Sequence, residues 1–250
     1  MYRQPVIIIV FFIYLIKRNV IMTRLKRTRI FLSCLLFTCP ALSFAQVHWF
    51  KSETIKPENI HSVKIVYDAD VNPAQITELS AVLDEINNTY INLKQIDLYI
   101  NSYGGNMDDG YVGYQAVKAS TIPVKTINSG MVASSATLIY CGGKSREMAP
   151  ESSFMLHPAK ALNTKNDYVS PSEINTLKKE SYQANNYFYS IYSTCTNMKK
   201  DKIENILYSE DNSDYIYSAQ AKNISLANKT EAGIKTTQIS YYITNDDNNK

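Results

Sequence analysis

The stretch GMVASSATLIYCGGKSREMAPESSFMLH, residues 130–157, decides how this chain is interpreted. Before it, Ile122 to Asn128 is rich in β-formers. Within it, Ala133–Tyr140 is small and apolar and is followed by two glycines, a usual helix stop. The order is therefore strand, tight turn, helix. Ser153–Leu156 is typical of a short buried strand, and the proline that follows His157 prevents further pairing.

Two residues of this stretch are candidates for chemistry. Ser134 falls at the start of the expected helix, where unpaired backbone N–H groups can stabilise an oxyanion beside an attacking hydroxyl. His157 falls at a strand end. Taken singly, such a serine is most often a helix cap, Ser135 could be the cap instead, and a lone histidine is more often structural. Taken together, the two residues predict a catalytic pair.

Length and composition favour one globular domain. The chain has 250 residues, of which 45% are hydrophobic, and that suffices for one substantial core. The formal net charge is +3, but seven of the 26 Lys and Arg residues lie in residues 1–45, which contain no acid. The other 19 face 23 acids, so the remaining chain has a net charge of −4. That balance argues against a nucleic-acid-binding surface.

Residues 1–45 are expected to be a leader. Two apolar runs, Val6–Ile16 and Ile30–Phe37, are both shorter than the roughly 18 residues of a membrane-spanning helix. The second run follows a basic segment that opens at Met22, and it precedes Ser43-Phe44-Ala45, which has small residues at −3 and −1. This pattern predicts a signal peptide over 22–45.

On this interpretation the mature protein begins at Gln46 and is periplasmic or secreted, and Met22 competes with Met1 as the true start. The alternative is a short N-terminus that anchors the protein in a membrane. An uncleaved leader would then be the chain's only membrane contact.

The cysteines and histidines indicate no metal site. Removal of the leader leaves Cys141 and Cys195 in an oxidising setting, where one disulfide is possible. The preferred interpretation is that Cys141 is a small buried residue after an apolar helix. The three histidines do not form a spaced ligand cluster with the cysteines: His48, His61 and His157. We expect no metal and no cofactor.

The body of the chain alternates strands and helices, after an irregular arm over 46–61. The order predicts a right-handed parallel α/β arrangement, in which ligands bind at the carboxyl ends of the strands. Gly104-Gly105, Ser134 and His157 all follow strands and can converge there, although Gly104-Gly105 alone could be a plain turn. The expected elements are the strands 62–67, 96–100, 122–128 and 153–156 and the helices 73–87, 107–119 and 133–140.

The second half of the chain is expected to be mainly helical. Ser170–Cys195 is a long helix with a broad apolar stripe, and a shorter helix follows over 198–207. An acidic turn, a short aromatic segment over 215–217 and a closing helix over 218–226 come next. The main domain is placed at 62–235, and 236–250 is expected to be a C-terminal tail.

Four motifs in this order resemble the proteolytic subunit of the Clp protease (ClpP), within the ClpP/crotonase fold. They are INSYGG at 100–105, GMVASSA at 130–136, FMLHP at 154–158 and DYIYSA at 214–219. The resemblance covers roughly residues 62–227. It implies an α/β fold with a parallel sheet, repeated β-α units and a helix that projects between the catalytic His and Asp.

Carried over residue by residue, the resemblance implies a serine peptidase with Ser134 as nucleophile, His157 as general base and Asp214 as orienting carboxylate. Backbone N–H groups of Gly104 and Ser135 would form the oxyanion hole, and Gly105 would bind substrate. Asp211 competes with Asp214 for the third role. A hydroxyl nucleophile needs such a base, and the base needs an anion.

Departures from the family pattern shape the expected activity. Tyr103 replaces the proline of the family's glycine turn, and the expected export separates the chain from the family's cytoplasmic ATP-driven unfoldase. We therefore expect an exported serine endopeptidase that acts on peptides or unfolded segments without that partner, as a ring-like homo-oligomer held by the 170–195 helix. Alternatives are an ATP-dependent Clp-type subunit, a crotonase-type acyl-CoA enzyme, a Ser-Lys peptidase using Lys144 or Lys125, and an inactive scaffold.

Overall fold

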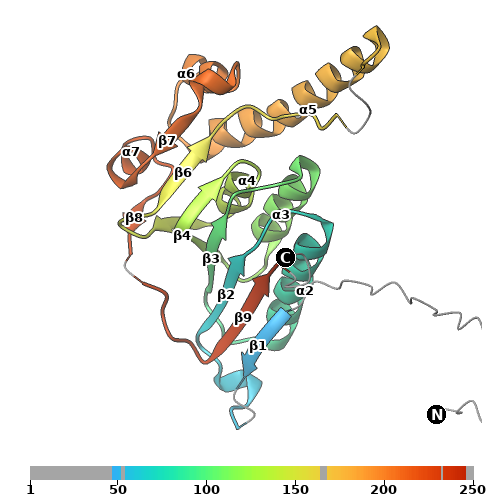
Figure 1. Ribbon diagram of the computed structural model, residues 1–250. Helices are drawn as coiled ribbons and strands as arrows, with labels where there is room; N and C mark the ends of the chain where they lie inside the picture. The colour runs from blue at the N-terminus through green and yellow to red at the C-terminus, as the bar shows by residue number, and fades with distance from the viewer. Residues whose placement is uncertain (1–46, 52–53, 164–167, 232, 246–250) are drawn as a thin grey trace, which may run out of the picture. The chain divides into compact units, whose positions relative to one another are not determined.

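The computed structural model describes residues 47–51, 54–163, 168–231 and 233–245, which belong to one compact unit (Figure 1). The strands in this part are β1 (Val47–Lys51), β2 (Val63–Asp68), β3 (Ile96–Ser102), β4 (Val124–Ala133), β5 (Ser145–Met148), β6 (Ser153–Leu156), β7 (Asp214–Ile216), β8 (Lys229–Thr230) and β9 (Ile239–Thr244). The helices are η1 (Pro57–Asn59), α2 (Pro73–Thr89), α3 (Met107–Ala119), α4 (Ala136–Cys141), α5 (Pro171–Cys195), α6 (Lys200–Ile206), η2 (Glu210–Asn212) and α7 (Ser218–Asn223).

The sheet confirms the expected parallel α/β architecture. Its order is β1-β9-β2-β3-β4-β5-β8, and all neighbours along this path are parallel except β1 and β9. The central strand β4 changes partner along its length: residues 125–128 pair with β5, and residues 131–133 pair with β6. β7 then pairs antiparallel with β6. The strands β6 and β7 therefore lie next to the end of β4, and the residue that follows β4 is Ser134.

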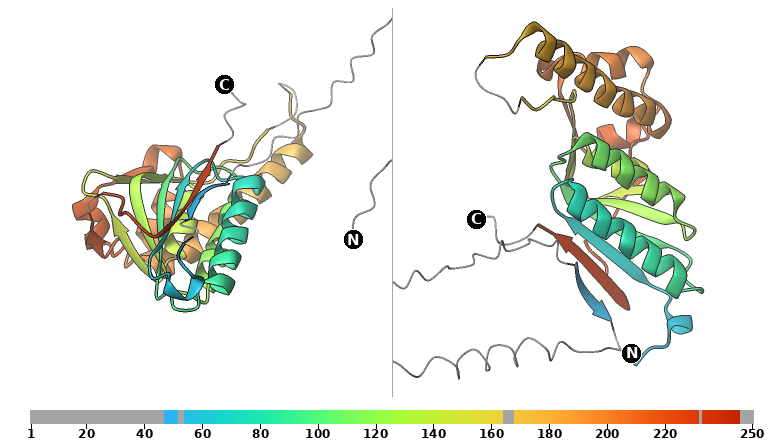
Figure 2. Two further views of the ribbon diagram at one scale, coloured as in Figure 1. Left: turned by 90° about the horizontal axis from the view of Figure 1, so that it is seen from below. Right: turned by 90° about the vertical axis from the view of Figure 1, so that its right-hand side faces the viewer.

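Helices α2 and α3 lie side by side against one face of the sheet (Figure 2). The Asn72 side chain caps α2 by accepting hydrogen bonds from Ala74 N and Gln75 N, and Pro73 occupies the first turn. The buried face of α2 carries Ile76, Leu79, Val82, Leu83 and Ile86. These are the five apolar residues that recur at helical spacing in the sequence.

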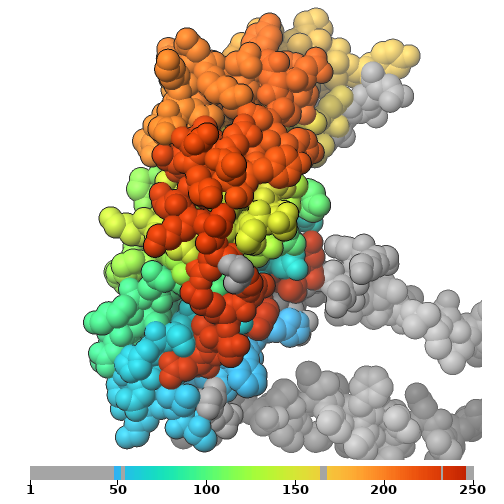
Figure 3. All heavy atoms as spheres, turned by 90° about the vertical axis from the view of Figure 1, so that its left-hand side faces the viewer, coloured from blue at the N-terminus to red at the C-terminus, as the bar shows by residue number. Residues whose placement is uncertain are grey.

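Both ends of the domain differ from the sequence prediction. The expected arm over 46–61 contains β1 and η1, and the expected tail over 236–250 contains β9, which lies between β1 and β2. In β9, Ile239, Tyr241 and Ile243 are each at most 2% exposed, so this strand is part of the core. The segment between β8 and β9 reaches that position by crossing the surface from the α6–α7 region toward β1 and β2 (Figure 3).

Helix α5 has two distinct halves. All of its fully buried residues lie from Phe188 to its end, whereas Ile174 and Tyr182 in the first half are exposed. The first half extends away from the sheet, as Figure 1 shows, and this confirms the expected projecting helix. The Ser170 hydroxyl and the Glu173 carboxylate form a capping box at its start, so the local sequence fixes where the projection begins.

No helix in the described part of the chain is long and apolar enough to cross a membrane. The expected leader over 1–45 and its cleavage site lie outside the described residues.

Candidate active site

Ser134 sits on a strained turn at the end of β4. Its φ is +54°, a left-handed value that a residue with a side chain seldom adopts. Its backbone N–H donates to Met155 O at 3.1 Å, which continues the β4–β6 ladder by one residue. The Ser134 backbone is therefore held against Met155 of the neighbouring strand, and Met155 lies two residues before His157. The side chain is half-buried, and its hydroxyl has no hydrogen-bond partner in the described residues.

Gly104 packs directly against Ser134. A Cβ added to Gly104 would lie 2.6 Å from Ser134 Cβ and 2.8 Å from Ala133 O, and its φ is +94°. Only glycine fits both the space and the conformation. The Gly104 carbonyl accepts from Val71 N at 2.9 Å, while the Gly104 N–H donates to Ser102 Oγ at 3.2 Å. The glycine turn that the sequence indicated is thus a close main-chain approach to the candidate nucleophile.

Ser135 occupies the N-cap position of α4 and makes no side-chain cap hydrogen bond. Its N–H has no acceptor among the described residues, and a Cβ placed on Gly104 would lie 3.1 Å from this nitrogen. The two expected oxyanion-hole residues are therefore neighbours, and both are buried. Gly105, the expected substrate-binding residue, is exposed and forms a parallel bridge with Val71.

His157 is largely buried, with 12% of its side chain exposed. Its Nδ1 lies 2.7 Å from Pro158 O. Because a carbonyl oxygen only accepts, this contact places the proton of the neutral imidazole on Nδ1 and leaves Nε2 as the acceptor. Nε2 is therefore in the form that a general base needs. The side chains of Ser134 and His157 are not joined by a hydrogen bond in the described residues.

The third member is where the structure departs from the sequence prediction. Asp214 pairs across the sheet with Leu156, one residue before His157, but its carboxylate accepts from Lys202 Nζ at 2.8 Å and from Gln220 Nε2. Among the described residues, the carboxylate within 4.0 Å of His157 is that of Glu210, with Oε1 3.5 Å from Nδ1. Glu210 also pairs with Lys160 at 3.1 Å.

Sequence reasoning missed Glu210, because an acid on an acidic turn has no distinguishing neighbour in the sequence. Its position on η2, four residues before Asp214, was the only available indication. Asp211, the competitor considered from sequence, makes no ion pair in the described residues, and its backbone N–H donates to Ser209 Oγ.

Neither lysine of the Ser-Lys alternative is placed to serve Ser134. Lys125 lies near the start of β4, nine residues before Ser134, or roughly 30 Å along an extended strand. Lys144 N donates to Val124 O and so lies at that same end.

The environment of Lys125 also disqualifies it as a base. Its Nζ is 3.2–3.7 Å from the carboxylates of Asp97, Glu147 and Glu231. Burial alone lowers the pKa of Lys125, but these carboxylates together raise it above the ordinary value. An ammonium with a raised pKa cannot accept the serine proton at neutral pH.

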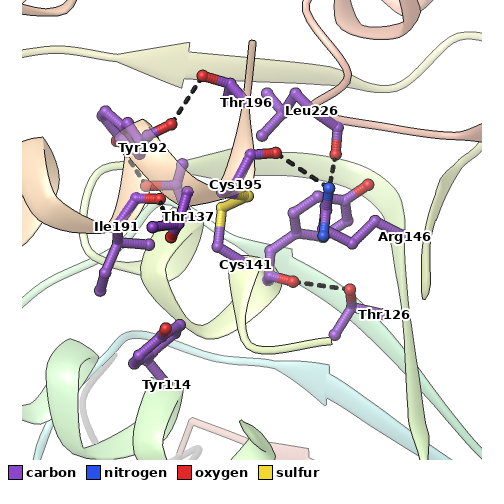
Figure 4. The surroundings of a disulfide bond; sticks show 12 residues. Tyr114, Thr126, Thr137, Cys141, Arg146, Ile191, Tyr192, Cys195, Thr196 and Leu226 are labelled. Atoms are coloured by element: carbon purple, nitrogen blue, oxygen red, sulfur yellow. Dashed lines mark hydrogen bonds between the residues drawn. A yellow bond between two sulfur atoms is a disulfide. The ribbon is translucent and has the colours of Figure 1, made fainter. Parts of the chain in front are cut away.

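A disulfide joins Cys141 at the end of α4 to Cys195 at the end of α5 (Figure 4). The preferred interpretation of Cys141 as a small buried thiol was wrong. The disulfide could not be predicted from local sequence, because Cys195 is 54 positions away and reaches Cys141 only through the packing of α5 on α4. The Thr137 and Tyr192 hydroxyls, 2.7 Å apart, make a second link between the same helices.

Known proteins match this chain in sequence and in fold. The family model described as Clp protease matches residues 58–231. An ATP-dependent Clp protease proteolytic subunit from Pleurastrum terricola is 35% identical over 95 residues, which are 37% of this chain and 48% of that protein. The matched part of the chain thus spans about half the length of this relative.

Two solved structures of ClpP1 from Listeria monocytogenes also match. An Asn-to-Asp mutant has a TM-score of 0.57 at 20% identity, covering 68% of this chain and 91% of that chain. The unmutated ClpP1 has a TM-score of 0.56 at 18% identity, with 68% and 92% covered. At these identities the structures support the fold, and the site is argued from the residues of this chain.

Proposed function

This chain belongs to the Clp protease family, and from that premise we propose that it is a serine endopeptidase that hydrolyses peptides or unfolded protein segments. One observation carries the proposal. Ser134 stands on a left-handed turn, with the Gly104 backbone packed against it and with β6 delivering His157 beside it. A crotonase-type enzyme needs the two amides but not this serine–histidine pair.

In the proposed reaction, the Ser134 hydroxyl attacks the scissile carbonyl carbon while His157 Nε2 takes its proton. The carbonyl oxygen becomes an oxyanion. The N–H of Ser135 stabilises it, together with the N–H of Gly104, which exchanges its bond to Ser102 Oγ for one to the oxyanion. His157 then gives the proton to the leaving amine, and an acyl-enzyme remains on Ser134 Oγ. Water, activated by the same imidazole, releases the acid and restores the serine.

We assign the orienting carboxylate to Asp214, whose backbone is anchored beside His157 and whose side chain is only 21% exposed. Glu210 is 48% exposed and shares its charge with Lys160, so its interaction with the imidazole is more strongly screened by water. Assembly of the triad then requires Asp214 to leave Lys202 and turn toward Nδ1. In this structure the partners of Nδ1 are Pro158 O at 2.7 Å and Glu210 Oε1 at 3.5 Å, which Asp214 would replace.

The proposed setting is outside the cytoplasm, without an ATP-driven unfoldase. The basic and apolar pattern over 22–45 supports export, and the Cys141–Cys195 disulfide is of the kind that persists in oxidising compartments. N-terminal sequencing of the protein from an exporting host should find Gln46 first. An intact leader on cytoplasmic material would contradict the proposed setting.

We further propose that the active form is a homo-oligomer joined through the first half of α5. Ile174 is 51% exposed and Tyr182 is 62% exposed on a helix that extends from the domain, and such exposed apolar surface is characteristic of interfaces. Phe188 and Ile191 are buried within this chain, so changing them would test folding rather than assembly.

Light scattering tests the assembly directly. The double variant Ile174→Glu/Tyr182→Glu should form a smaller assembly in solution than the wild type, whereas the control Lys179→Glu, also on α5, should keep the wild-type assembly. A monodisperse monomer with full activity in the wild type would rule out the oligomer.

The peptidase activity is tested by incubating the purified protein, without nucleotide, with a library of fluorogenic peptides and with an unfolded and a folded form of one substrate domain. We expect cleavage of peptides and of the unfolded form only. Hydrolysis that depends on added ATP and an unfoldase would favour the Clp-type alternative, and no cleavage of any substrate would favour the inactive scaffold.

A further inference from the structure

The Cys141–Cys195 disulfide forms part of the wall of a cavity. The cavity has a volume of about 450 Å³ and lies between the end of α3, the start of β4 and the ends of α4 and α5. Cys141 is 8% exposed and Cys195 is 4% exposed. The two cysteines are thus almost completely buried, and the disulfide reaches solvent through the cavity.

The cavity wall carries a concentration of positive charge. Lys118, Lys144 and Arg146 line it, and no Asp or Glu does. None of the three has a carboxylate within 4.0 Å in the described residues, in contrast to Lys125, which has three. A concave surface lined by one sign of charge concentrates ions of the opposite sign.

The cations have neutral partners that fix where their charge lies. Lys118 Nζ donates to Tyr114 Oη at 2.7 Å and stands 5.0 Å from the centre of that ring. Arg146 donates from Nη2 to the carbonyls of Cys195 and Ser225, and from Nε to Leu226 O, as Figure 4 shows in part. Arg146 therefore holds its positive charge next to the backbone of one disulfide cysteine.

We propose that this cavity is a binding site for small anionic thiols, which exchange with the Cys141–Cys195 disulfide. Thiol–disulfide exchange begins with a thiolate, an anion, and a positive environment favours both the arriving thiolate and the thiolate that leaves. Among the described residues, these features coincide here: a disulfide, an opening to solvent and cations without acidic partners. The inference does not depend on the peptidase proposal.

The exchange is balanced by two thiol molecules. The first thiolate attacks Sγ of Cys141, the more exposed of the two cysteines, and Cys195, whose carbonyl binds Arg146, leaves as a thiolate. A second thiolate attacks the external sulfur of the mixed disulfide, and Cys141 leaves. The protein gains two electrons and, after protonation, two thiol groups, while the two external thiols are oxidised to one disulfide. The covalent link between α4 and α5 is then open, and the Thr137–Tyr192 contact is left to join them.

The test measures the reduction rate of the oxidised protein with three thiols of different charge: 2-mercaptoethanesulfonate, 2-mercaptoethanol and cysteamine. Each rate is taken at equal thiolate concentration and is divided by the rate of the same thiol on bis(2-hydroxyethyl) disulfide. We expect the anionic thiol to be favoured over the cationic one by about tenfold at low ionic strength. The preference should vanish in 1 M salt, where the screening length falls to about 3 Å.

The double variant Lys118→Gln/Lys144→Gln should lose most of this preference while its thermal unfolding stays close to that of the wild type, since both side chains are exposed. The control Lys56→Gln/Lys179→Gln removes the same charge from elsewhere and should keep the preference. Equal normalised rates for all three thiols, a preference unchanged in Lys118→Gln/Lys144→Gln, or a disulfide that no thiol reduces in the folded protein would each overturn the proposal.

Discussion

The two halves of the candidate site are built from different materials. The nucleophile half is main chain: Ser134, Gly104 and Met155 are held by φ values, a ladder hydrogen bond and close packing. The acid–base half depends on side-chain ion pairs with exposed lysines: Asp214 pairs with Lys202, and Glu210 pairs with Lys160 and contacts His157. Buried backbone has one arrangement, whereas exposed ion pairs contribute only about 0–1 kcal/mol and are exchanged at little cost. The first half is thus preformed, and the second is completed by rearrangement.

The largest expected effect comes from removing the preformed nucleophile. Ser134→Ala should lower kcat by about six orders of magnitude, as for a catalytic unit whose members act together. The turn is made by the backbone, so the thermal unfolding temperature should stay near that of the wild type. Peptide hydrolysis and calorimetry measure the two properties. Substantial turnover in this variant would place the chemistry elsewhere.

Next in size is the choice between the two carboxylates. Asp214→Asn should lower kcat by about 10⁴-fold if it orients His157 in the active state, and Glu210→Gln should lower it by less than about tenfold, since its charge is exposed. Lys202→Gln, which releases Asp214, should not lower kcat. The reverse ranking of the Asp214 and Glu210 variants would show that Glu210 is the partner of His157 and would correct the assignment.

A smaller loss is expected when the preformed half is distorted. Gly104→Ala adds a Cβ that overlaps Ser134 Cβ and Ala133 O, so kcat should fall by about 10²–10³-fold through displacement of one oxyanion donor. Gly233→Ala is the matched control: its φ is +74°, but nothing lies within 4 Å of the added Cβ. The control carries the backbone strain without the overlap. Equal turnover in the two variants would exclude a role for the Gly104 approach.

The smallest effect on turnover should come from removing the disulfide, which is attached to the end of α4 that lies farther from Ser134 in the sequence. We expect Cys141→Ala/Cys195→Ala to stay within about tenfold of wild-type kcat, because Ser134 is held by Met155 and Gly104. Its stability should fall by up to about 4 kcal/mol, the chain-entropy value for a loop of this length. Urea unfolding with and without reductant measures the loss, and unchanged stability would contradict it.

The sequence was most informative where local patterns decide the structure. Asn72 with Pro73, the Gly104 turn and the Ser170 capping box each specify a backbone conformation within a few residues, and the helices that follow them lie close to the predicted ranges. Strand β9 was missed because its burial comes from pairing with β2, 176 positions earlier in the register Val63 to Ile239. Ile239, Tyr241 and Ile243 do alternate as in a strand, but the polar run that follows them favoured a tail.

The same distinction applies to the site. Ser134 and His157 could be predicted because strand, turn and proline signals fix their positions in the backbone. The partner of His157 could not, because the short strand β7 brings Asp214 to the correct neighbourhood but leaves its side chain a choice between Lys202 and the imidazole. Motif order identifies such a carboxylate, and its rotamer depends on neighbours that no motif contains.

The central claim, a preformed serine nucleophile, is tested most directly by covalent labelling. The purified protein is treated with a fluorophosphonate, and the modified residue is mapped by mass spectrometry. We predict one label per chain, on Ser134, with slower labelling in Asp214→Asn and none in Ser134→Ala. A label on another residue, or no label on a protein that hydrolyses peptides, would contradict the account.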